Sequence, residues 1–313
     1  MKLHKLGQRA VRAASASAVL LGLMAAGQDA LAGIANTRHN LSNQANPIAG
    51  RNQVTGTTNP TNPSASTGTE EICVFCHTPH AADVSNPLEN PPLWNKQLLP
   101  AAGYTTYASL NSATIDGEIL NVGSTSVACL SCHDGSQAMD NIINAPGSGG
   151  LLANGGDVNG RAWTWTGTNV TADGLLTGVA NLTKDLSNDH PIGIQYCGGF
   201  GTAANVNTCR DADFVTPTAG TQTVGGVTRP IYWVDTSGRG GAATTTRDKT
   251  DMILFTRDFV GGPGNPGGPG PSVECGSCHD PHADATAAGS LAGATFLRVS
   301  NTGSQVCLAC HNK

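Results

Sequence analysis

The sequence has few of the side chains that build most globular proteins. Of its 313 residues, only 12% are charged and 4% are aromatic, while 40 residues are glycine. Charged residues make up about 25% of an ordinary globular chain. A chain of this composition offers little periodic apolar material for long amphipathic helices or regular sheets. We therefore expect a mostly irregular backbone that packs on something other than its own side chains.

No apolar run is long enough for a transmembrane helix. The run Ala18–Ala25 is too short to span a bilayer, which argues against a membrane anchor. Basic residues precede this run and Ala30-Leu31-Ala32 follows it, which is the pattern of a secretory signal with its cleavage site. No cysteine stands at that site, so a lipoprotein anchor is not expected. We predict an exported protein that has no membrane span and begins at Gly33.

An excess of basic residues is also missing. Removal of residues 1–32 leaves 13 basic and 21 acidic residues, a net charge of −8. Proteins that bind nucleic acids neutralise phosphates with lysine and arginine, so their binding surfaces are basic. This charge balance argues against nucleic acid as a partner.

Cysteine carries the clearest signal in the chain. Eight of the ten cysteines form four CxxC pairs, and a histidine directly follows each pair, which is the attachment signature of c-type haem. Zinc sites also use CxxC pairs but do not require a histidine at that position, so its fourfold recurrence favours haem. The predicted attachment residues are Cys73, Cys76, Cys129, Cys132, Cys275, Cys278, Cys307 and Cys310, and the predicted proximal iron ligands are His77, His133, His279 and His311.

The sequence therefore predicts a multihaem cytochrome c with four covalently bound c-type haems. Each porphyrin is a large, rigid apolar disc, and such discs can replace the core that the side chains cannot supply. The expected fold is mostly irregular coil, with short helices and a few β-hairpins, wrapped around a stacked haem chain.

The histidine count predicts the remaining iron ligands. After His4 leaves with the signal peptide, eight histidines remain for the eight axial positions of four irons. The predicted distal ligands are His39, His80, His190 and His282. Met139 and Met252 are the alternative ligands, but neither lies in a repeated motif. Because no iron would be open to substrate, we expect an electron carrier without catalytic residues, and a reductase with one open haem is the alternative.

Two of the distal candidates share one position of a repeated CxxCHxPH motif. Three residues span at most about 11 Å, so His80 cannot pass round the porphyrin to the far side of the haem that His77 ligates. We expect His80 to ligate the adjacent haem at Cys129 and Cys132 instead. By the same reasoning, we expect His282 to ligate the haem of the CLACH motif at the C-terminus.

The haem motifs also divide the chain. Each half opens with a CxxCHxPH motif and closes with a CLxCH motif, as an internal repeat would. The predicted regions are a signal peptide at 1–32, an extended N-terminal arm at 33–70, a first haem pair at 71–139, a haem-free loop and β-rich insert carrying His190 at 140–273, and a second haem pair at 274–313.

The insert has its own local signals. Gly225-Gly226 between two β-prone runs predicts a two-residue hairpin turn. Pro230 favours an edge strand for residues 231–234, because proline lacks the N–H that an inner strand needs. The Gly- and Pro-rich stretch 261–271 is typical of a linker or an exposed loop. Cys197 and Cys209 lie outside the haem motifs, so in an exported protein we expect a disulfide, with two free thiols as the alternative.

The arm with His39 is followed by the motifs CVFCHTPH, CLSCHDG, CGSCHDPH and CLACHNK and by the DHPIG segment at His190. In these residues the chain resembles the OmcE-like extracellular tetrahaem cytochromes that polymerise into conductive filaments. The resemblance implies a homopolymer with a continuous haem chain, supplied by upstream redox partners and discharging to extracellular acceptors such as metal oxides. It implies an extracellular or cell-surface location. The alternative is a monomeric periplasmic shuttle that feeds a terminal reductase.

The resemblance also implies a role for the arm. In such filaments an N-terminal histidine ligates a haem of the next subunit. Carried onto this chain, His39 would ligate the haem at Cys275 and Cys278 of a neighbouring copy. His190 would then serve the haem of the first motif.

Overall fold

The structure is a computed structural model that describes residues 33–46, 48–56, 68–80, 82, 93–100, 103–144, 163–202, 205–224, 226–236, 247–262, 265, 267–283 and 296–312. The predicted signal peptide at 1–32 lies outside these residues. Among the described residues, no helix is both long and apolar enough to cross a membrane.

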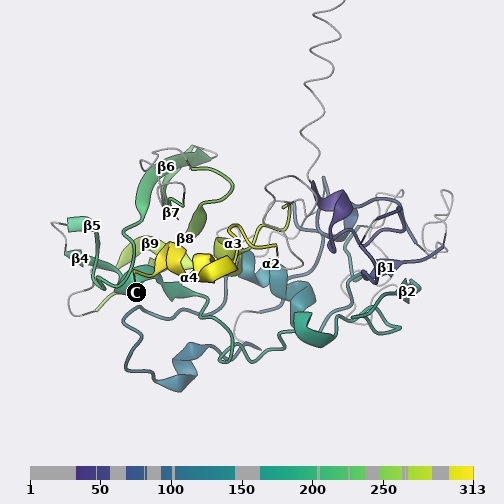
Figure 1. The fold of residues 1–313 in the computed structure, drawn as a ribbon, viewed down its shortest axis with the longest axis horizontal. Coiled ribbons are helices and arrows are strands. Elements are labelled where there is room, and N and C mark those ends of the chain that lie inside the picture. Colours follow the sequence, from purple (N-terminus) through teal and green to yellow (C-terminus); the bar gives the residue numbers. More distant parts are fainter. Residues whose placement is uncertain are drawn as a thin grey trace, which may run out of the picture.

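Short elements separated by irregular segments make up the fold (Figure 1). The helices are α2 (Ser124–His133), α3 (Cys275–Cys278) and α4 (Gln305–Cys310), with 3₁₀ turns η1 (Gly33–Asn36), η3 (Cys73–Phe75), η5 (Tyr107–Leu110), η6 (Gly178–Ala180), η7 (Tyr196–Gly198) and η8 (Thr302–Ser304). The strands are β1 (Gln53–Val54), β2 (Trp165–Thr166), β3 (Ile194–Gln195), β4 (Phe200–Thr202), β5 (Asn205–Cys209), β6 (Thr218–Val224), β7 (Val227–Val234), β8 (Met252–Phe259) and β9 (Gly268–Val273). The expected coil with short helices and hairpins is confirmed.

The insert forms an antiparallel sheet in the order β3-β9-β8-β7-β6. Val224 pairs with Val227, which confirms the predicted two-residue turn between β6 and β7. Cys197 and Cys209 form a disulfide beside this sheet.

Two expectations for the insert are wrong. Tyr232 and Trp233 pair with β8 on one side and β6 on the other, so this part of β7 is not an edge. The predicted linker contributes β9, whose residues 268–271 pair with β8. In both strands the prolines lie where the strand has a single paired neighbour, so a missing N–H leaves no gap in the ladder.

The N-terminal region also differs from the extended arm that its composition predicts. Leu41 and Val54 are buried in an apolar cluster, and β1 pairs with β2. The guanidinium of Arg51 donates hydrogen bonds to the carbonyl groups of Asn40, Ser42 and Gln44. These bonds satisfy backbone groups that no helix or strand satisfies, which allows an irregular segment to pack against the body of the protein.

Among the residues that the structure describes, the buried apolar side chains form three clusters. The first comprises Leu41, Val54, Val74, Phe75, Met139, Ile142, Trp163, Trp165 and Leu176. The second comprises Tyr196, Cys197, Tyr232, Val234, Met252, Leu254 and Ala309. The third comprises Val122, Val127, Leu130 and Leu186. The two candidate methionine ligands thus lie in clusters, with Met139 in the first and Met252 in the second.

A buried carboxylate joins α2 to α3. Glu274 caps α3 and accepts hydrogen bonds from Ser126 of α2 (2.6 Å), Arg257 of β8 (2.9 Å) and Ser272 of β9 (3.0 Å). Burial raises the pKa of Glu274, while the bonds from Ser126 and Arg257 oppose this rise. The Glu274 side chain is 0% exposed and that of Arg257 is 10% exposed. Loss of the glutamate would therefore leave the Arg257 charge buried without its partner.

We predict that Glu274→Ala lowers the free energy of unfolding by about 3–5 kcal/mol, the usual cost of removing one partner of a buried ion pair. Denaturant unfolding of the purified protein, followed by circular dichroism, measures this change. Glu71→Ala is the matched control, because Glu71 is exposed. Equal stability of the two variants would contradict the structural role assigned to Glu274.

Candidate multihaem centre

Each CxxCH motif is folded as one helical turn. The amide N–H of the histidine donates to the carbonyl of the first cysteine in the first, third and fourth motifs, at 2.8, 3.1 and 3.0 Å. The second motif forms the last turn of α2. Residues three apart lie on the same face of a helical turn, so both sulfurs of a motif project to one side. This is the arrangement that two thioether bonds to a single porphyrin require.

The first two motifs lie next to each other. Cys76 and Cys132 both pack against the first apolar cluster. Burial raises the pKa of the Cys76 thiol to about 12, and the neighbouring Cys132 contributes to this rise. The two motifs that the sequence assigns to the first haem pair are therefore together in space.

The second and third motifs meet where α2 packs on α3. The amide N–H of Cys275 donates to the hydroxyl of Ser126 at 3.0 Å. The thiol of Cys129 donates a hydrogen bond to the sulfur of Cys275, which raises the pKa of Cys129 and lowers that of Cys275.

The third and fourth motifs share the second apolar cluster, because Cys278 and Cys310 both pack against it. Burial raises the pKa of Cys278 to about 11, with smaller contributions from Cys275 and Cys307. The four motifs therefore follow one another in chain order. Figure 1 shows α2, α3 and α4 in succession across the middle of the molecule.

Two distal candidates lie beside proximal histidines. The ring centres of His77 and His282 are 6.0 Å apart, with 15° between the ring planes. Those of His39 and His133 are 6.2 Å apart, with 73° between the planes. The pKa of the partly exposed His39 is lowered to about 4. Burial of the imidazole is the main cause, and the adjacent His133 is the second. Neither position matches the expectation, which gave His282 to the fourth motif and His39 to a neighbouring subunit.

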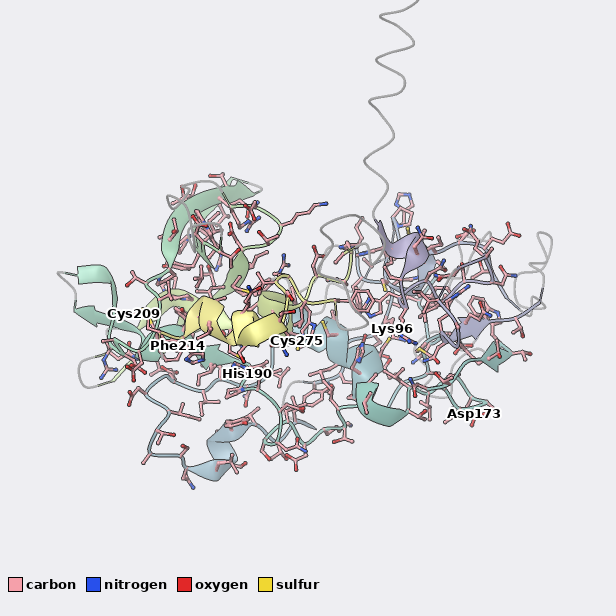
Figure 2. The ribbon with its side chains drawn as sticks, viewed as in Figure 1. Lys96, Asp173, His190, Cys209, Phe214 and Cys275 are labelled. Carbon is pink, nitrogen blue, oxygen red and sulfur yellow. A yellow bond between two sulfur atoms is a disulfide. The ribbon has the colours of Figure 1, made fainter. Side chains whose placement is uncertain are left out.

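The other two distal candidates are at the surface. His80 and His190 are both exposed. The Nδ1 atom of His190 lies 3.1 Å from the carbonyl oxygen of Pro191. Figure 2 shows His190 on the same side of the molecule as Phe214, whose ring lies 4.5 Å from that of His311.

Several residues near the motifs were missed by the sequence analysis. The ring of Trp94 lies 5.9 Å from that of His77, and Phe296 stacks on His39 at 4.1 Å. Lys96 is buried, and its ammonium group donates to the carbonyl groups of Ala138 (2.8 Å) and Asn141 (3.2 Å). The scarcity of aromatic residues was the one sequence signal that could have drawn attention to Trp94 and Phe296.

Two buried donors test whether the site fits haem. The indole N–H of Trp94 and the hydroxyl of Thr125 have no hydrogen-bond partner among the described residues. Trp94 lies against His77, and Thr125 belongs to the helix that ends in the second motif. Haem carries propionates, which are strong acceptors for such donors. The paired sulfurs, adjacent imidazoles and unsatisfied donors together fit covalently bound haem.

Comparison with known families points the same way. A family described as "Doubled CXXCH motif" matches residues 268–313, which contain the third and fourth motifs. Comparisons with curated proteins and with solved structures gave no significant match. The match supports a multihaem c-type cytochrome, in which CXXCH motifs bind haem covalently and the haems transfer electrons.

Proposed function

We propose that this chain is an exported tetrahaem cytochrome that carries electrons along four haems, each iron bound by two histidines. The observation that carries the proposal is the succession of neighbouring cysteines: Cys76 with Cys132, Cys129 with Cys275, and Cys278 with Cys307. Because thioether bonds fix a porphyrin to its cysteines, four haems bound at these neighbouring attachment points would lie in one row.

The chain supplies position, ligands and electrostatics to this row. Bound haems would supply one-electron couples between ferric and ferrous iron. The eight imidazoles of the exported chain would fill every axial position and keep substrates away from the irons. The buried charge of Lys96 lies close enough to Cys76 to lower the pKa of that thiol, and a nearby positive charge also favours the reduced state of a haem.

The finer part of the proposal is an extracellular role as a conductive homopolymer that passes electrons to extracellular acceptors. Its support is the resemblance of the motifs to filament-forming cytochromes, together with the order of the haem sites. Copies that meet end to end would continue the row. A monomeric periplasmic shuttle is the second candidate, because His39 lies against His133 of its own chain instead of projecting toward a neighbour.

We predict four haems per chain, all low-spin. A pyridine haemochrome assay should give four equivalents, and the reduced protein should bind no carbon monoxide at neutral pH. Fewer than four equivalents would contradict the proposal. Binding of carbon monoxide at one iron would instead support the alternative of a reductase with an open haem.

Electron microscopy of the secreted protein should show filaments with a repeating subunit. We expect filaments because end-to-end contacts would continue the haem row from one copy to the next. If the secreted or periplasmic fraction contains only monomers at all concentrations, the filament is excluded and the shuttle remains.

Replacement of Lys96 should change the electron affinity of the nearest haems. Lys96→Gln removes one buried positive charge, so we expect at least one reduction potential to fall by on the order of 50 mV. Spectroelectrochemical titration measures this change. Lys184→Gln is the matched control, because Lys184 is exposed. The reduction potentials of this variant should match those of the unmodified protein. Unchanged potentials in Lys96→Gln would show that this charge does not act on the haems.

A further inference from the structure

Two imidazoles that bind opposite faces of one iron have a fixed separation. A metal–imidazole bond is about 2 Å, and roughly 1 Å more separates that nitrogen from the ring centre, so the two ring centres lie ~6 Å apart. The structure contains two histidine pairs at this spacing, His77 with His282 at 6.0 Å and His39 with His133 at 6.2 Å. Each pair contains one motif histidine and one histidine outside the CxxCH motifs.

The second ring nitrogen of three of these histidines faces an oxygen atom. Metal-binding histidines usually direct this nitrogen to a carbonyl or a carboxylate, which fixes the orientation of the ring. The Nδ1 atom of His133 lies 2.8 Å from the carbonyl oxygen of Ala180, and His39 bonds the carbonyl of Pro281. The Nδ1 atom of His282 lies 3.9 Å from Asp280 Oδ1. In His133 and His282 this arrangement leaves Nε2 for a metal.

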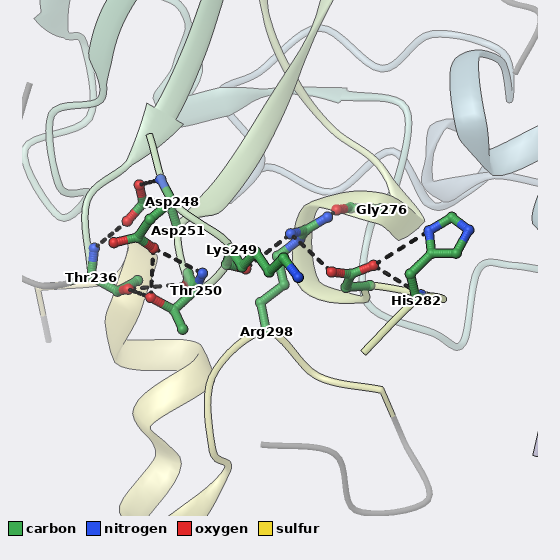
Figure 3. Close-up of polar contacts among 9 residues, drawn as sticks. Thr236, Asp248, Lys249, Thr250, Asp251, Gly276, His282 and Arg298 are labelled. Atoms are coloured by element: carbon green, nitrogen blue, oxygen red, sulfur yellow. Dashed lines mark hydrogen bonds and ion pairs between the residues drawn. The ribbon is translucent and has the colours of Figure 1, made fainter. Parts of the chain in front are cut away.

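The loop that carries His282 is held in place (Figure 3). The backbone N–H of His282 donates to Asp280 Oδ1 at 2.9 Å, and Asp280 Oδ2 lies 3.9 Å from the guanidinium of Arg298. Arg298 also donates to the carbonyl groups of Gly276 (3.0 Å) and Lys249 (3.1 Å). His282 is therefore tied to the helix of the third motif while its ring faces the first.

The segment that carries His39 is held equally well. Arg51 bonds three carbonyl groups within residues 40–44, directly after His39. Phe296 stacks on the His39 ring at 4.1 Å, with 9° between the planes. These contacts come from the same chain, so His39 is positioned without a neighbouring subunit.

We infer that His282 is the distal ligand of the haem at Cys73 and Cys76, opposite His77, and that His39 is the distal ligand of the haem at the second motif, opposite His133. This inference rests on the proposed tetrahaem function. It makes the two halves of the repeat exchange a ligand, because His282 belongs to the second half and serves the first. His80 and His190 then remain for the irons of the third and fourth motifs.

The two assigned haems differ in a measurable property. The ring planes are nearly parallel in the pair of His77 and His282, at 15°, and nearly perpendicular in the pair of His39 and His133, at 73°. In low-spin ferric haem, parallel ligand planes give a rhombic electron paramagnetic resonance signal. Perpendicular planes give a highly anisotropic signal, so each ligand can be matched to its own signal.

The test replaces each distal ligand by methionine in the full-length exported protein. His282→Met should remove a rhombic signal, and His39→Met should remove a highly anisotropic one. Each variant should also gain the red charge-transfer band of methionine-bound ferric haem. His190→Met is the control, because it should leave both assigned signals unchanged.

Combining His282→Met with variants that lack one haem attachment site identifies the iron that His282 binds. Without the first haem, in Cys73→Ala/Cys76→Ala, His282→Met should give no methionine band. Without the fourth haem, in Cys307→Ala/Cys310→Ala, it should give the full band. The opposite pattern would overturn the assignment of His282. If His282→Met does not mature, His282→Gly with added imidazole replaces it, and imidazole should then restore a low-spin haem only where the first haem is present.

The His39 assignment has a matched test. His39→Met should give no methionine band in Cys129→Ala/Cys132→Ala, and His39→Gly with imidazole again replaces a variant that does not mature. Monomers isolated by size exclusion should keep all four haems low-spin, whereas donation of His39 by a neighbour would produce one high-spin haem on dilution. An unmodified protein with fewer than four low-spin haems before dilution refutes the proposed function itself. Four low-spin haems with the wrong haem responding refute only this inference.

Discussion

The helical turn of the CxxCH motif is the local constraint on which the rest of the structure depends. In this turn the histidine N–H bonds the carbonyl of the first cysteine, which places two sulfurs and one imidazole on a short rigid unit. The rest of the described chain is mostly irregular, and its buried apolar side chains form three small clusters. In such a chain the motif turns are rigid, whereas the connecting segments are not.

Buried charged side chains form many of the hydrogen bonds that hold the irregular segments in place, a role that regular secondary structure has in most proteins. Arg51 and Lys96 each donate to backbone carbonyl groups of irregular segments, and Glu274 connects α2, α3 and two strands. A buried charge that loses its partners is costly, so these residues favour one arrangement over the many that loops could adopt. The few charged side chains of this sequence therefore have structural roles out of proportion to their number.

The sequence predicted the features that depend on local chemistry. The motifs, the turn at Gly225-Gly226 and the overall irregularity follow from neighbouring residues. It failed where distant segments meet. Pro230 suggested an edge strand, but β8 pairs with the residues of β7 that follow this proline. The polar composition of residues 33–56 gave no sign of the hydrogen bonds of Arg51. The repeat suggested ligands shared within each half, whereas His282 lies beside His77 of the other half.

The contact between Cys129 and Cys275 has a consequence for biogenesis. A side-chain hydrogen bond joins the two cysteines, and the same chain contains the disulfide of Cys197 and Cys209. In an oxidising compartment, a polypeptide that compacted without its prosthetic groups would be one oxidation step from a covalent bond between the second and third motifs. Thioether formation would remove both thiols from that reaction, so haem attachment would have to precede compaction of the chain.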